Sequence, residues 1–574
     1  MPGIVGLTTG RWPLNTAQRA LGKMQDLIAY TEPCRRDELF SDRILCATRA
    51  TTDIIQKQPQ PHSESGIYAW LDGEIYNREE LAREAKLYAE TDAALLVALY
   101  RQGDDFSFLK KIDGIYSAAI YDADRQKLHL ISDRYGLRHL FWTIHEESIA
   151  WASEVKALLA VPDFDPKIDP VALNDFLRFG HMLGDRTWFE GVELLRAGTV
   201  LTWDERERSV SQHRYWWWDQ IKPLTGKMNE NELVEELGSL FIAAVQRRCP
   251  AHERVGLTLS GGLDSRAILA AMPQRGDAIH AATFGKAGCD DIRLAAAAAR
   301  VKGAAHHVSE VNSDNWLMPR VEGVWHTDGH LNLMHMHIIA VASEISGLFD
   351  ICLDGFLGDA TIGGSYIGDP QFDEIRQIDN RGRRFIALGP KTLRAYVETR
   401  LPFFDNKFME LTISIPEALR KNSYLYRKML LKSFPEFFRT IPWQKTGSPI
   451  RWPGPLEEIT QLTLRGRDKL LRVMARFGLA LDDRKTYTDY PQWIRQEPSR
   501  SFFKEVLGHG AALYPAYIPP EQVRSDLACH LNGEDRSESL CRILTFEIWL
   551  QQVFEGKYRP TLDARSTLAV MSAG

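Results

Sequence analysis

The stretch that decides the fold is Val255-Gly-Leu-Thr-Leu-Ser-Gly-Gly-Leu-Asp-Ser-Arg266. Its first half is apolar and prone to form a β-strand, and residues 267–272 read as a short apolar helix. The pattern is therefore strand, glycine turn, helix. Backbone N–H groups at such a turn point outward together with the positive end of the helix dipole, so the stretch predicts an anion site.

The side chains of this loop fit a phosphate held together with a cation. Ser260 and Ser265 offer hydroxyl donors, while Asp264 is a carboxylate that can lie beside a phosphate when a magnesium ion separates them. The alternative is an ordinary strand-to-helix connection. The string Ser-Gly-Gly-Leu-Asp-Ser resembles the pyrophosphate loop of ATP pyrophosphatases, which cleave ATP between the α and β phosphates. This resemblance implies ATP contacts from Leu259, Ser260, Gly261, Gly262 and Ser265.

Length and composition predict a multidomain globular protein. The chain has 574 residues, which at about 100–200 residues per domain gives two to four domains. The net charge of −6 argues against broad non-specific binding of nucleic acid. Seven cysteines without a C-x-x-C pair favour neither a zinc site nor a disulfide framework, and fit a reducing cytoplasm. We expect no signal peptide and no membrane span.

Residues 1–211 contain short alternating or apolar runs separated by turn signals, such as Gly3 to Leu7 and Thr199 to Trp203. This pattern indicates a β-rich sandwich with a few helices. Five patches resemble, in order and spacing, the glutaminase domain of asparagine synthetase. They are Asp72-Gly-Glu-Ile-Tyr-Asn77, Thr91-Asp92, Asp113-Gly114, Asp133-Arg-Tyr-Gly-Leu-Arg138 and Ser153-Glu-Val-Lys-Ala157.

One departure from that family concerns the nucleophile. In glutamine-hydrolysing members, removal of the initiator methionine exposes a cysteine that supplies a thiolate and an α-amine. Here Met1 is followed by Pro2, which has no nucleophilic side chain. We therefore expect no glutamine hydrolysis. Arg49, Asn77 and Asp92 are then structural residues, the interpretation we favour, or remnants of a binding site.

Residues 212–231 read as a connector whose three adjacent tryptophans clamp the two domains together. Residues 232–454 continue the strand–helix alternation with a second strand at His280 to Gly285 and a third at His306 to Val308. This alternation predicts a doubly wound parallel sheet with ligands at the carboxyl ends of its strands. Adenine contacts are expected from Thr283, Phe284 and Gly285. Asp291 and Arg293 read as solvated helix charges.

A second glycine-rich patch, residues 351–365, places Gly358 and Asp359 after another apolar run. Asp264 and Asp359, from separate strand ends, could bridge magnesium to the triphosphate. In asparagine synthetases and in β-lactam synthetase the matching aspartate has this role. Phe356, three residues earlier, cannot move a proton. Ala360 stands where asparagine synthetases have an acid, which weakens the fit to asparagine formation itself.

Lys445 matches, by its order and spacing after these patches, the family lysine that faces pyrophosphate and the reacting carbonyl. By this resemblance the catalytic residues are Lys445, Asp264 and Asp359. The basic run of residues 376–394 favours a solvated face, with a patch for an anionic substrate as the alternative. The histidines between residues 326 and 337 do not match a metal motif, and Thr327 or Asp328 is expected to cap a helix. Residues 455–574 read as a helical extension.

The resemblance implies an ATP-dependent ligase that activates a carboxylate as an acyl-adenylate for attack by an amine. Its cofactors would be ATP and Mg²⁺, and its partners a small-molecule or peptide carboxylate and an amine, with no membrane; a homodimer is an open alternative. β-Lactam synthetase and lasso-peptide cyclases also lack the N-terminal cysteine, so intramolecular macrolactam or β-lactam formation is one alternative function. A non-catalytic ATP-binding scaffold is another, although it would be expected to lose Asp264, Asp359 or Lys445.

Overall fold

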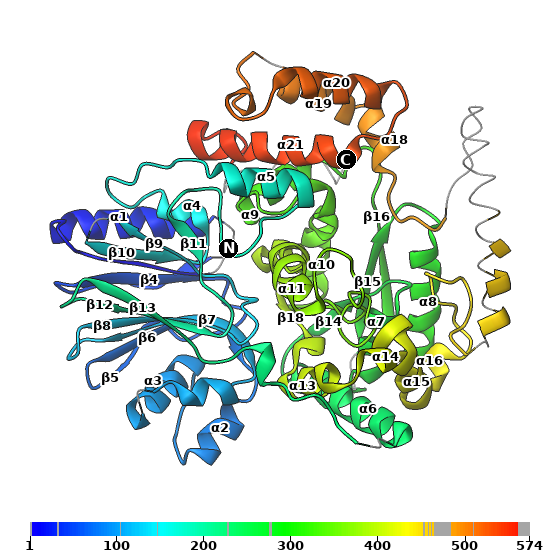
Figure 1. Cartoon of the computed structure of the whole chain (residues 1–574), viewed down its shortest axis with the longest axis horizontal. Helices are drawn as coiled ribbons and strands as arrows, with labels where there is room; N and C mark the ends of the chain where they lie inside the picture. The colour runs from blue at the N-terminus through cyan, green and yellow to red at the C-terminus, as the bar shows by residue number, and fades with distance from the viewer. Residues whose placement is uncertain are drawn as a thin grey trace.

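The computed structural model describes residues 3–30, 34–103, 105–145, 147–226, 229–274, 278–451, 454–456, 458–460, 462–463, 466, 484–508 and 510–560. Two antiparallel sheets form the N-terminal domain and a parallel sheet with helices forms the C-terminal domain (Figure 1). The predicted two-domain fold, a β-rich sandwich followed by a doubly wound parallel sheet, is thereby confirmed. Met1 and Pro2, on which the nucleophile prediction rests, lie outside the described residues.

The N-terminal domain is a sandwich of two sheets with strand orders β11-β9-β10-β1-β4-β2, where β3 also pairs with β4, and β13-β12-β8-β7-β6-β5. Large side chains of the inner faces, such as Trp70, Trp151 and Trp203, pack between the sheets. Helices α1 (Leu14–Ile28) and α3 (Asp92–Gln102) cover the two outer faces (Figure 1). The strands are β1 (Gly3–Thr8), β2 (Arg35–Arg36), β3 (Phe40–Ser41), β4 (Leu45–Thr51), β5 (His62–Glu64), β6 (Ile67–Ile75), β7 (Gly114–Asp122), β8 (Lys127–Ser132), β9 (Phe141–His145), β10 (Ser148–Ala152), β11 (Val192–Leu194), β12 (Thr199–Asp204) and β13 (Ser209–Arg214).

The C-terminal domain is built on a five-stranded parallel sheet of order β16-β15-β14-β17-β18. Its central strand β14 pairs with β15 on one side and β17 on the other, so the direction of winding reverses at β14. At such a switch point a crevice opens beyond the carboxyl ends of the strands, where ligands bind. The strands are β14 (Val255–Thr258), β15 (His280–Gly285), β16 (Ala305–Glu310), β17 (Ile351–Leu353) and β18 (Glu398–Arg400).

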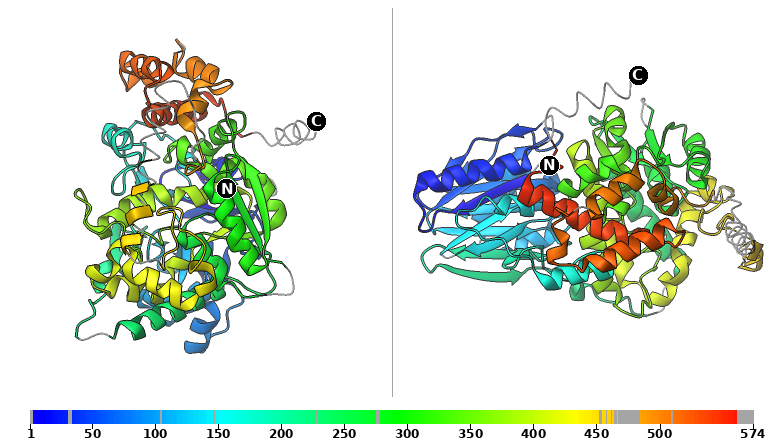
Figure 2. Two further views of the ribbon diagram at one scale, coloured as in Figure 1. Left: turned by 90° about the vertical axis from the view of Figure 1, so that its right-hand side faces the viewer. Right: turned by 90° about the horizontal axis from the view of Figure 1, so that it is seen from above.

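Helices surround this sheet and extend beyond it. The first group comprises α6 (Glu230–Arg247), α7 (Leu263–Ala271), α8 (Asp290–Lys302), α9 (Met318–His326), α12 (Leu388–Lys391), α13 (Asn406–Ser414), α15 (Tyr424–Ser433) and α16 (Pro435–Phe438). The C-terminal group, α18 (Tyr490–Arg495), α19 (Ser499–Gly508), α20 (Pro520–Leu531) and α21 (Ser537–Leu550), lies over both domains (Figure 2). Arg542 of α21 donates to the carbonyl of Leu177 in α5 (Pro170–Phe179) at 2.7 Å. Within the helical extension expected at residues 455–574, most of residues 456–477 lie outside the described residues.

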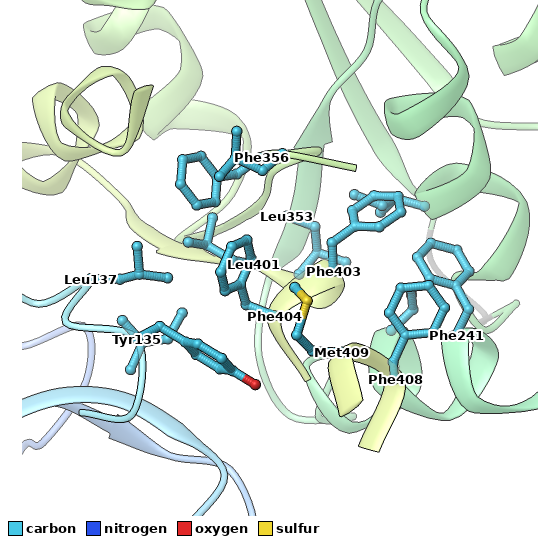
Figure 3. Packing of buried hydrophobic residues seen from close by; sticks show 14 of the residues in the cluster. Tyr135, Leu137, Phe241, Leu353, Phe356, Leu401, Phe403, Phe404, Phe408 and Met409 are labelled. Atoms are coloured by element: carbon cyan, nitrogen blue, oxygen red, sulfur yellow. The ribbon is translucent and has the colours of Figure 1, made fainter. Parts of the chain in front are cut away.

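The two domains share their hydrophobic cores. Tyr135 and Leu137 of the N-terminal domain pack in one cluster with Leu401 and Phe404 of the C-terminal domain (Figure 3). The ring centroids of Tyr135 and Phe404 are 5.1 Å apart. Trp216 and Trp218 of the connector each lie 5.4 Å from the Tyr135 ring and belong to the cluster that spans both domains, so two of the three tryptophans pack at the domain junction. Trp217 instead stacks with Arg214, whose guanidinium lies 4.1 Å from the ring centroid.

The basic run of residues 376–394 is mostly buried, so the prediction of a solvated face was wrong. Arg383 and Arg384 are 2% and 3% exposed. Arg384 donates to the carbonyl of Gly184 at 2.6 Å, and Arg383 to that of Leu195 at 3.3 Å. Both acceptors belong to the N-terminal domain. These arginines therefore join the two domains by hydrogen bonds to backbone carbonyls. The guanidinium N–H groups that make these bonds are not available to an anionic substrate.

A buried ion-pair network also joins the domains. Arg138 pairs with Asp72 in its own domain and with Glu398 across the interface at 2.8 Å, and all three side chains are below 10% exposed. Replacing Arg138 by methionine would leave two buried carboxylates without their cation. We expect Arg138→Met to lower the free energy of unfolding by about 3–5 kcal/mol. Urea unfolding measures this loss, and Arg500→Met, at an exposed position, is the control expected to change it by less than about 0.5 kcal/mol. Equal stability of the two variants would contradict a stabilising role for the network.

Candidate active site

The loop between β14 and α7 is held in shape by its own hydroxyl groups. Ser265 Oγ accepts the N–H of Ser260 at 3.0 Å, and the two serine hydroxyls are 3.1 Å apart. Ser260 Oγ in turn accepts the N–H of Gly262 at 3.2 Å. Gly262 precedes Leu263, the first residue of α7, so the loop delivers the chain directly to a helix N-terminus. This is the geometry in which helix N–H groups bind phosphate.

Gly261 is fixed by a contact that the sequence does not indicate. Its N–H donates to Asp291 Oδ1 at 2.7 Å, and Asp291 is 8% exposed. The prediction that Asp291 is a solvated helix charge was therefore wrong, whereas Arg293 is exposed as expected. A Cβ at position 261 would lie 2.9 Å from the Cβ of Gln444, so the neighbouring loop approaches closely because this residue is glycine.

The two predicted metal ligands lie together. Asp264 Oδ2 accepts the N–H of Asp359 at 2.9 Å, and Asp264 Oδ1 accepts the hydroxyl of Tyr426 at 2.8 Å. Gly358 permits this approach, since a Cβ there would be 2.6 Å from Asp264 Cγ. Burial, together with the charge of Asp359, raises the pKa of Asp264 to about 8. Two carboxylates therefore face one site in which their charges repel each other.

This pair fits a magnesium ion. Mg²⁺ prefers carboxylate and phosphate oxygens, and a cation between Asp264 and Asp359 would relieve the repulsion that raises the pKa of Asp264. Asp359 is exposed and accepts the hydroxyl of Ser365 at 3.2 Å, so its carboxylate is oriented yet accessible. The residues present thus suit the metal that the sequence implies.

Magnesium binding is expected to strengthen as pH rises. A carboxylate must lose its proton before it binds a metal, and Asp264 has a pKa of about 8 without metal. Below that pH, affinity should fall by up to about tenfold per pH unit. Calorimetric titration of Mg²⁺ into the protein with α,β-methylene-ATP, at pH 6.5 and pH 7.5, measures the change. The same affinity at both pH values, with no proton released, would show that Asp264 is already ionised or does not bind the metal.

Lys445 lies on a tight loop beside the loop between β14 and α7, residues 259–262, which we call the phosphate loop. The N–H of Gln444 donates to the carbonyl of Gly261 at 3.3 Å, and Arg266 of α7 donates to the carbonyl of Ile441 at 3.4 Å. These contacts join the two loops. The Lys445 side chain is exposed, with its Nζ 5.4 Å from the centroid of the Trp443 ring. The lysine is therefore adjacent to the site but folded over its own loop.

A cavity of about 610 Å³ opens at the carboxyl ends of the strands. Ser260, Gly262, Asp264, Ser265 and Asp359 lie on one side of it, and Leu259, Thr283 and Phe284 also line it. Gly261, Gly285, Gly358 and Lys445 adjoin the cavity without being part of its lining. Most of the predicted site residues therefore converge on one space, although they come from segments more than 90 residues apart in the chain.

The histidines of the cavity have protein partners. Among the described residues, no group of three or more metal-ligating side chains occurs. His337 Nδ1 lies 2.7 Å from the Tyr490 hydroxyl, and burial lowers the pKa of His337 well below its usual value, so it is neutral. His335 lies 3.2 Å from the carboxylate of Glu538. Contrary to expectation, Asp328 does not cap a helix beside the cleft but accepts a backbone N–H at the start of α4 (Val155–Leu158) in the other domain, from Val155 at 2.9 Å.

Sequence reasoning missed three residues of the site. Tyr426 bonds to Asp264 from α15, and Tyr487 lines the cavity next to Phe284, with ring centroids 6.3 Å apart. Asp354 adds a further carboxylate to the lining, and burial raises its pKa to about 6. No local pattern marks the two tyrosines as functional. Asp354 could have been noticed because it directly follows the apolar run of β17.

In the N-terminal domain, the polar residues of the glutaminase-like patches bond to the chain itself. Arg49 is 2% exposed and donates to Asp37 at 2.7 Å, and its other nitrogens donate to the carbonyls of Gln56 and Gln58. Asp92 accepts the N–H of Ile75 at 2.8 Å, and Asn77 donates to the carbonyl of Lys111 at 2.9 Å. A cavity of about 920 Å³ lies beside these residues. Their contacts fit the structural interpretation.

Two family models match the chain, one in each domain. The model for a glutamine amidotransferase domain matches residues 1–216, and the model for asparagine synthase matches residues 236–385. Together they define a two-domain protein that combines an amidotransferase-like sandwich with a synthetase domain. The chain belongs to the asparagine synthetase superfamily.

Curated relatives agree with this assignment. Amidase chry2 of Gibberella zeae is 32% identical over 254 residues, which is 42% of this chain and 37% of the amidase. Glutamine-hydrolysing asparagine synthetase 2 of Bacillus subtilis is 28% identical over 284 residues, 47% of this chain and 38% of that protein. A putative asparagine synthetase of Mycobacterium bovis is 27% identical over 378 residues, 63% of this chain and 54% of that protein. Each of these matches spans less than two thirds of the relative's own length. No helix in the described part of the chain is long and apolar enough to span a membrane.

Proposed function

We propose that the protein is an ATP-dependent ligase that joins a carboxylic acid to an amine and releases AMP and pyrophosphate. The observation that carries this proposal is the convergence of the phosphate loop, the Asp264–Asp359 pair and the Lys445 loop on one cavity. The proposal includes no glutamine hydrolysis, because Pro2 follows Met1 where glutamine-hydrolysing members have a cysteine.

In the first half-reaction, a carboxylate oxygen attacks the α-phosphorus, an O–P bond forms, and the bond to the β-phosphate oxygen breaks. Ser260, Gly262 and Ser265 hold the leaving pyrophosphate at the start of α7. Asp264 and Asp359 would hold magnesium, which offsets phosphate charge when bound. In the second half-reaction an amine attacks the carbonyl carbon of the acyl-adenylate, so that a C–N bond forms, the C–O bond to AMP breaks, and the amine nitrogen loses a proton to water. Lys445, a point charge on a flexible stem, stabilises the negative charge that develops in both steps.

The contacts of Arg49 in the N-terminal domain support an amine source other than glutamine. The Arg49 guanidinium is occupied by Asp37 and two carbonyls, so a free amino acid would have to displace these bonds to bind there. The amine is therefore free ammonia, a second molecule, or a group on the acyl substrate itself. In the last case the product is a lactam.

The experiment that tests this function uses hydroxylamine as a small, reactive acceptor. The protein is incubated with Mg²⁺, ATP, hydroxylamine and a broad panel of carboxylic acids, and nucleotides and hydroxamates are quantified. AMP, pyrophosphate and hydroxamate in equal amounts are expected, and ADP as the product would overturn the proposal. Glutamine added to the same mixture should yield no glutamate, since the proposed enzyme has no glutaminase activity.

A further inference from the structure

The active-site cavity has two sides of different composition. On the β15 side lie Thr283, Phe284 and Tyr487, next to the phosphate loop. On the β17 side lie Phe356 and Leu357, which follow the strand, with Ile386 and Pro390 from the segment around α12. The proposed adenine contacts occupy the first side and the phosphates lie at the central strand. The second side is therefore left for the acyl substrate.

Most of the side chains that form the wall on the β17 side are apolar, with His335 and His337 beside them. Phe356 and Leu357 are 3% and 4% exposed, and the Phe356 ring packs against Phe404 with centroids 5.1 Å apart (Figure 3). Ile386 and Pro390 are half-buried and present apolar surface to the cavity. Ile338, 8% exposed, completes this wall from the neighbouring 3₁₀ segment His337–Val341. A substrate body lying here would contact hydrocarbon, which is favourable for an uncharged group and costly for a charged one.

The charged groups of the same cavity are carboxylates. Asp264, Asp291, Asp354 and Asp359 all line it, and ATP adds the charges of its phosphates. Asp291 is engaged with Gly261, and Asp264 and Asp359 suit magnesium, while Asp354 has a contact with the Thr258 hydroxyl at 3.5 Å. Asp354 is then the lining carboxylate left to repel a second carboxylate on the substrate, at short range, where the surrounding protein screens charge weakly.

We propose that the acyl substrate carries its reacting carboxyl group on an uncharged, largely apolar body, and that free α-amino dicarboxylic acids such as aspartate are excluded. The apolar β17-side wall receives the body, and the Asp354 carboxylate repels a second carboxylate. A carboxyl side chain within a peptide meets this requirement, because its α-amino and α-carboxyl groups are converted to neutral amides. This inference rests on the proposed ligase function and specifies its substrate class.

Three probes test the inference with hydroxylamine as the acceptor and AMP formation as the readout. They are L-aspartate, N-acetyl-L-aspartic acid α-methylamide and 3-phenylpropionate. The first two present the same reacting carboxyl group and differ in the charges on the α-carbon substituents. We expect kcat/KM for the blocked aspartate to exceed that for free aspartate at least tenfold, and 3-phenylpropionate to be turned over as well. Equal or faster turnover of free aspartate would overturn the inference while leaving the ligase function in place.

A variant of the apolar wall separates the placement of the acyl body from the ligase function. Ile386→Lys places a cation in the apolar wall and is expected to lower kcat/KM for 3-phenylpropionate at least tenfold, with unchanged affinity for α,β-methylene-ATP. Val171→Lys, the same kind of change at a position 47% exposed on α5, should leave all rates unchanged. Wild-type turnover by Ile386→Lys would overturn the placement of the acyl body. If none of the three probes led to AMP formation, the proposed substrate class would be overturned. The ligase function would then be tested separately with the broad panel of carboxylic acids.

Discussion

Replacing Lys445 by alanine is expected to reduce ligase turnover by roughly 10²–10³-fold or more while the protein stays folded. The side chain is exposed, so its removal leaves no cavity and no unpaired buried group. Its loop stays attached to the phosphate loop through the backbone of Gln444, which the substitution does not alter. The loss should therefore appear in kcat for AMP formation at saturating ATP and not in the melting temperature.

Two further variants sharpen the Lys445 prediction. Lys445→Arg keeps the charge on a planar, forked group and should restore part of the rate. Lys504→Ala removes an exposed lysine from α19, far along the chain from the site, and should leave kcat unchanged. If Lys445→Ala turned over at the wild-type rate, the lysine would have no part in the mechanism.

Asp264→Asn should abolish magnesium-dependent ATP cleavage and at the same time stabilise the metal-free protein at alkaline pH. An amide is a poor substitute for a carboxylate as a magnesium ligand, so we expect AMP formation to fall by roughly 10²-fold or more. The amide oxygen can still accept the N–H of Asp359, and its NH₂ group can donate to the Tyr426 hydroxyl oxygen. Asp359 and Tyr426 therefore each keep a hydrogen bond with position 264, although the Tyr426 hydroxyl now accepts where it donated before.

The pH dependence of stability has a definite sign. The pKa of Asp264 is raised in the folded state to about 8, so the folded protein holds a proton that the unfolded chain has already released. Between the unfolded and folded pKa values, the contribution of Asp264 to stability consequently falls as pH rises. Asparagine does not titrate, so in the variant the contribution of position 264 to stability no longer falls as pH rises. Melting temperatures without Mg²⁺ at pH 5.5 and pH 8.5 should therefore differ less in Asp264→Asn than in the wild type, and an unchanged difference would contradict the raised pKa.

The sequence predicts the centre of the site well because the signals there are local. The apolar run at β14, the glycine turn and the apolar helix are contiguous, and the structure places β14 at Val255–Thr258 and α7 at Leu263–Ala271. Asp359 follows a strand in the same way, so the meeting of two strand ends in a parallel sheet follows from topology. The position of Lys445 came from order and spacing relative to a family, not from its own surroundings.

The contacts that sequence reasoning missed join residues far apart in the chain. Asp291 lies 30 positions from Gly261, and Tyr426 lies 162 positions from Asp264. A helix charge is normally solvated, so nothing in the run around Asp291 indicates that its partner is a backbone N–H. The prediction of a solvated face for Arg383 and Arg384 was wrong for a similar reason. Their partners are carbonyl oxygens of the other domain, and every residue type has a carbonyl.

The hydrophobic cluster shared by Tyr135, Leu137, Leu401 and Phe404 has a consequence for how this protein can change over evolution. Phe356 packs against Phe404, so the wall of the ligase cavity is supported from behind by rings that the amidotransferase-like domain helps to bury. Deleting that domain would expose these rings to water and loosen the wall. Under the proposed ligase function, the amidotransferase-like domain would thus be kept as a structural support of its neighbour, and mutations in it would reduce ligase activity.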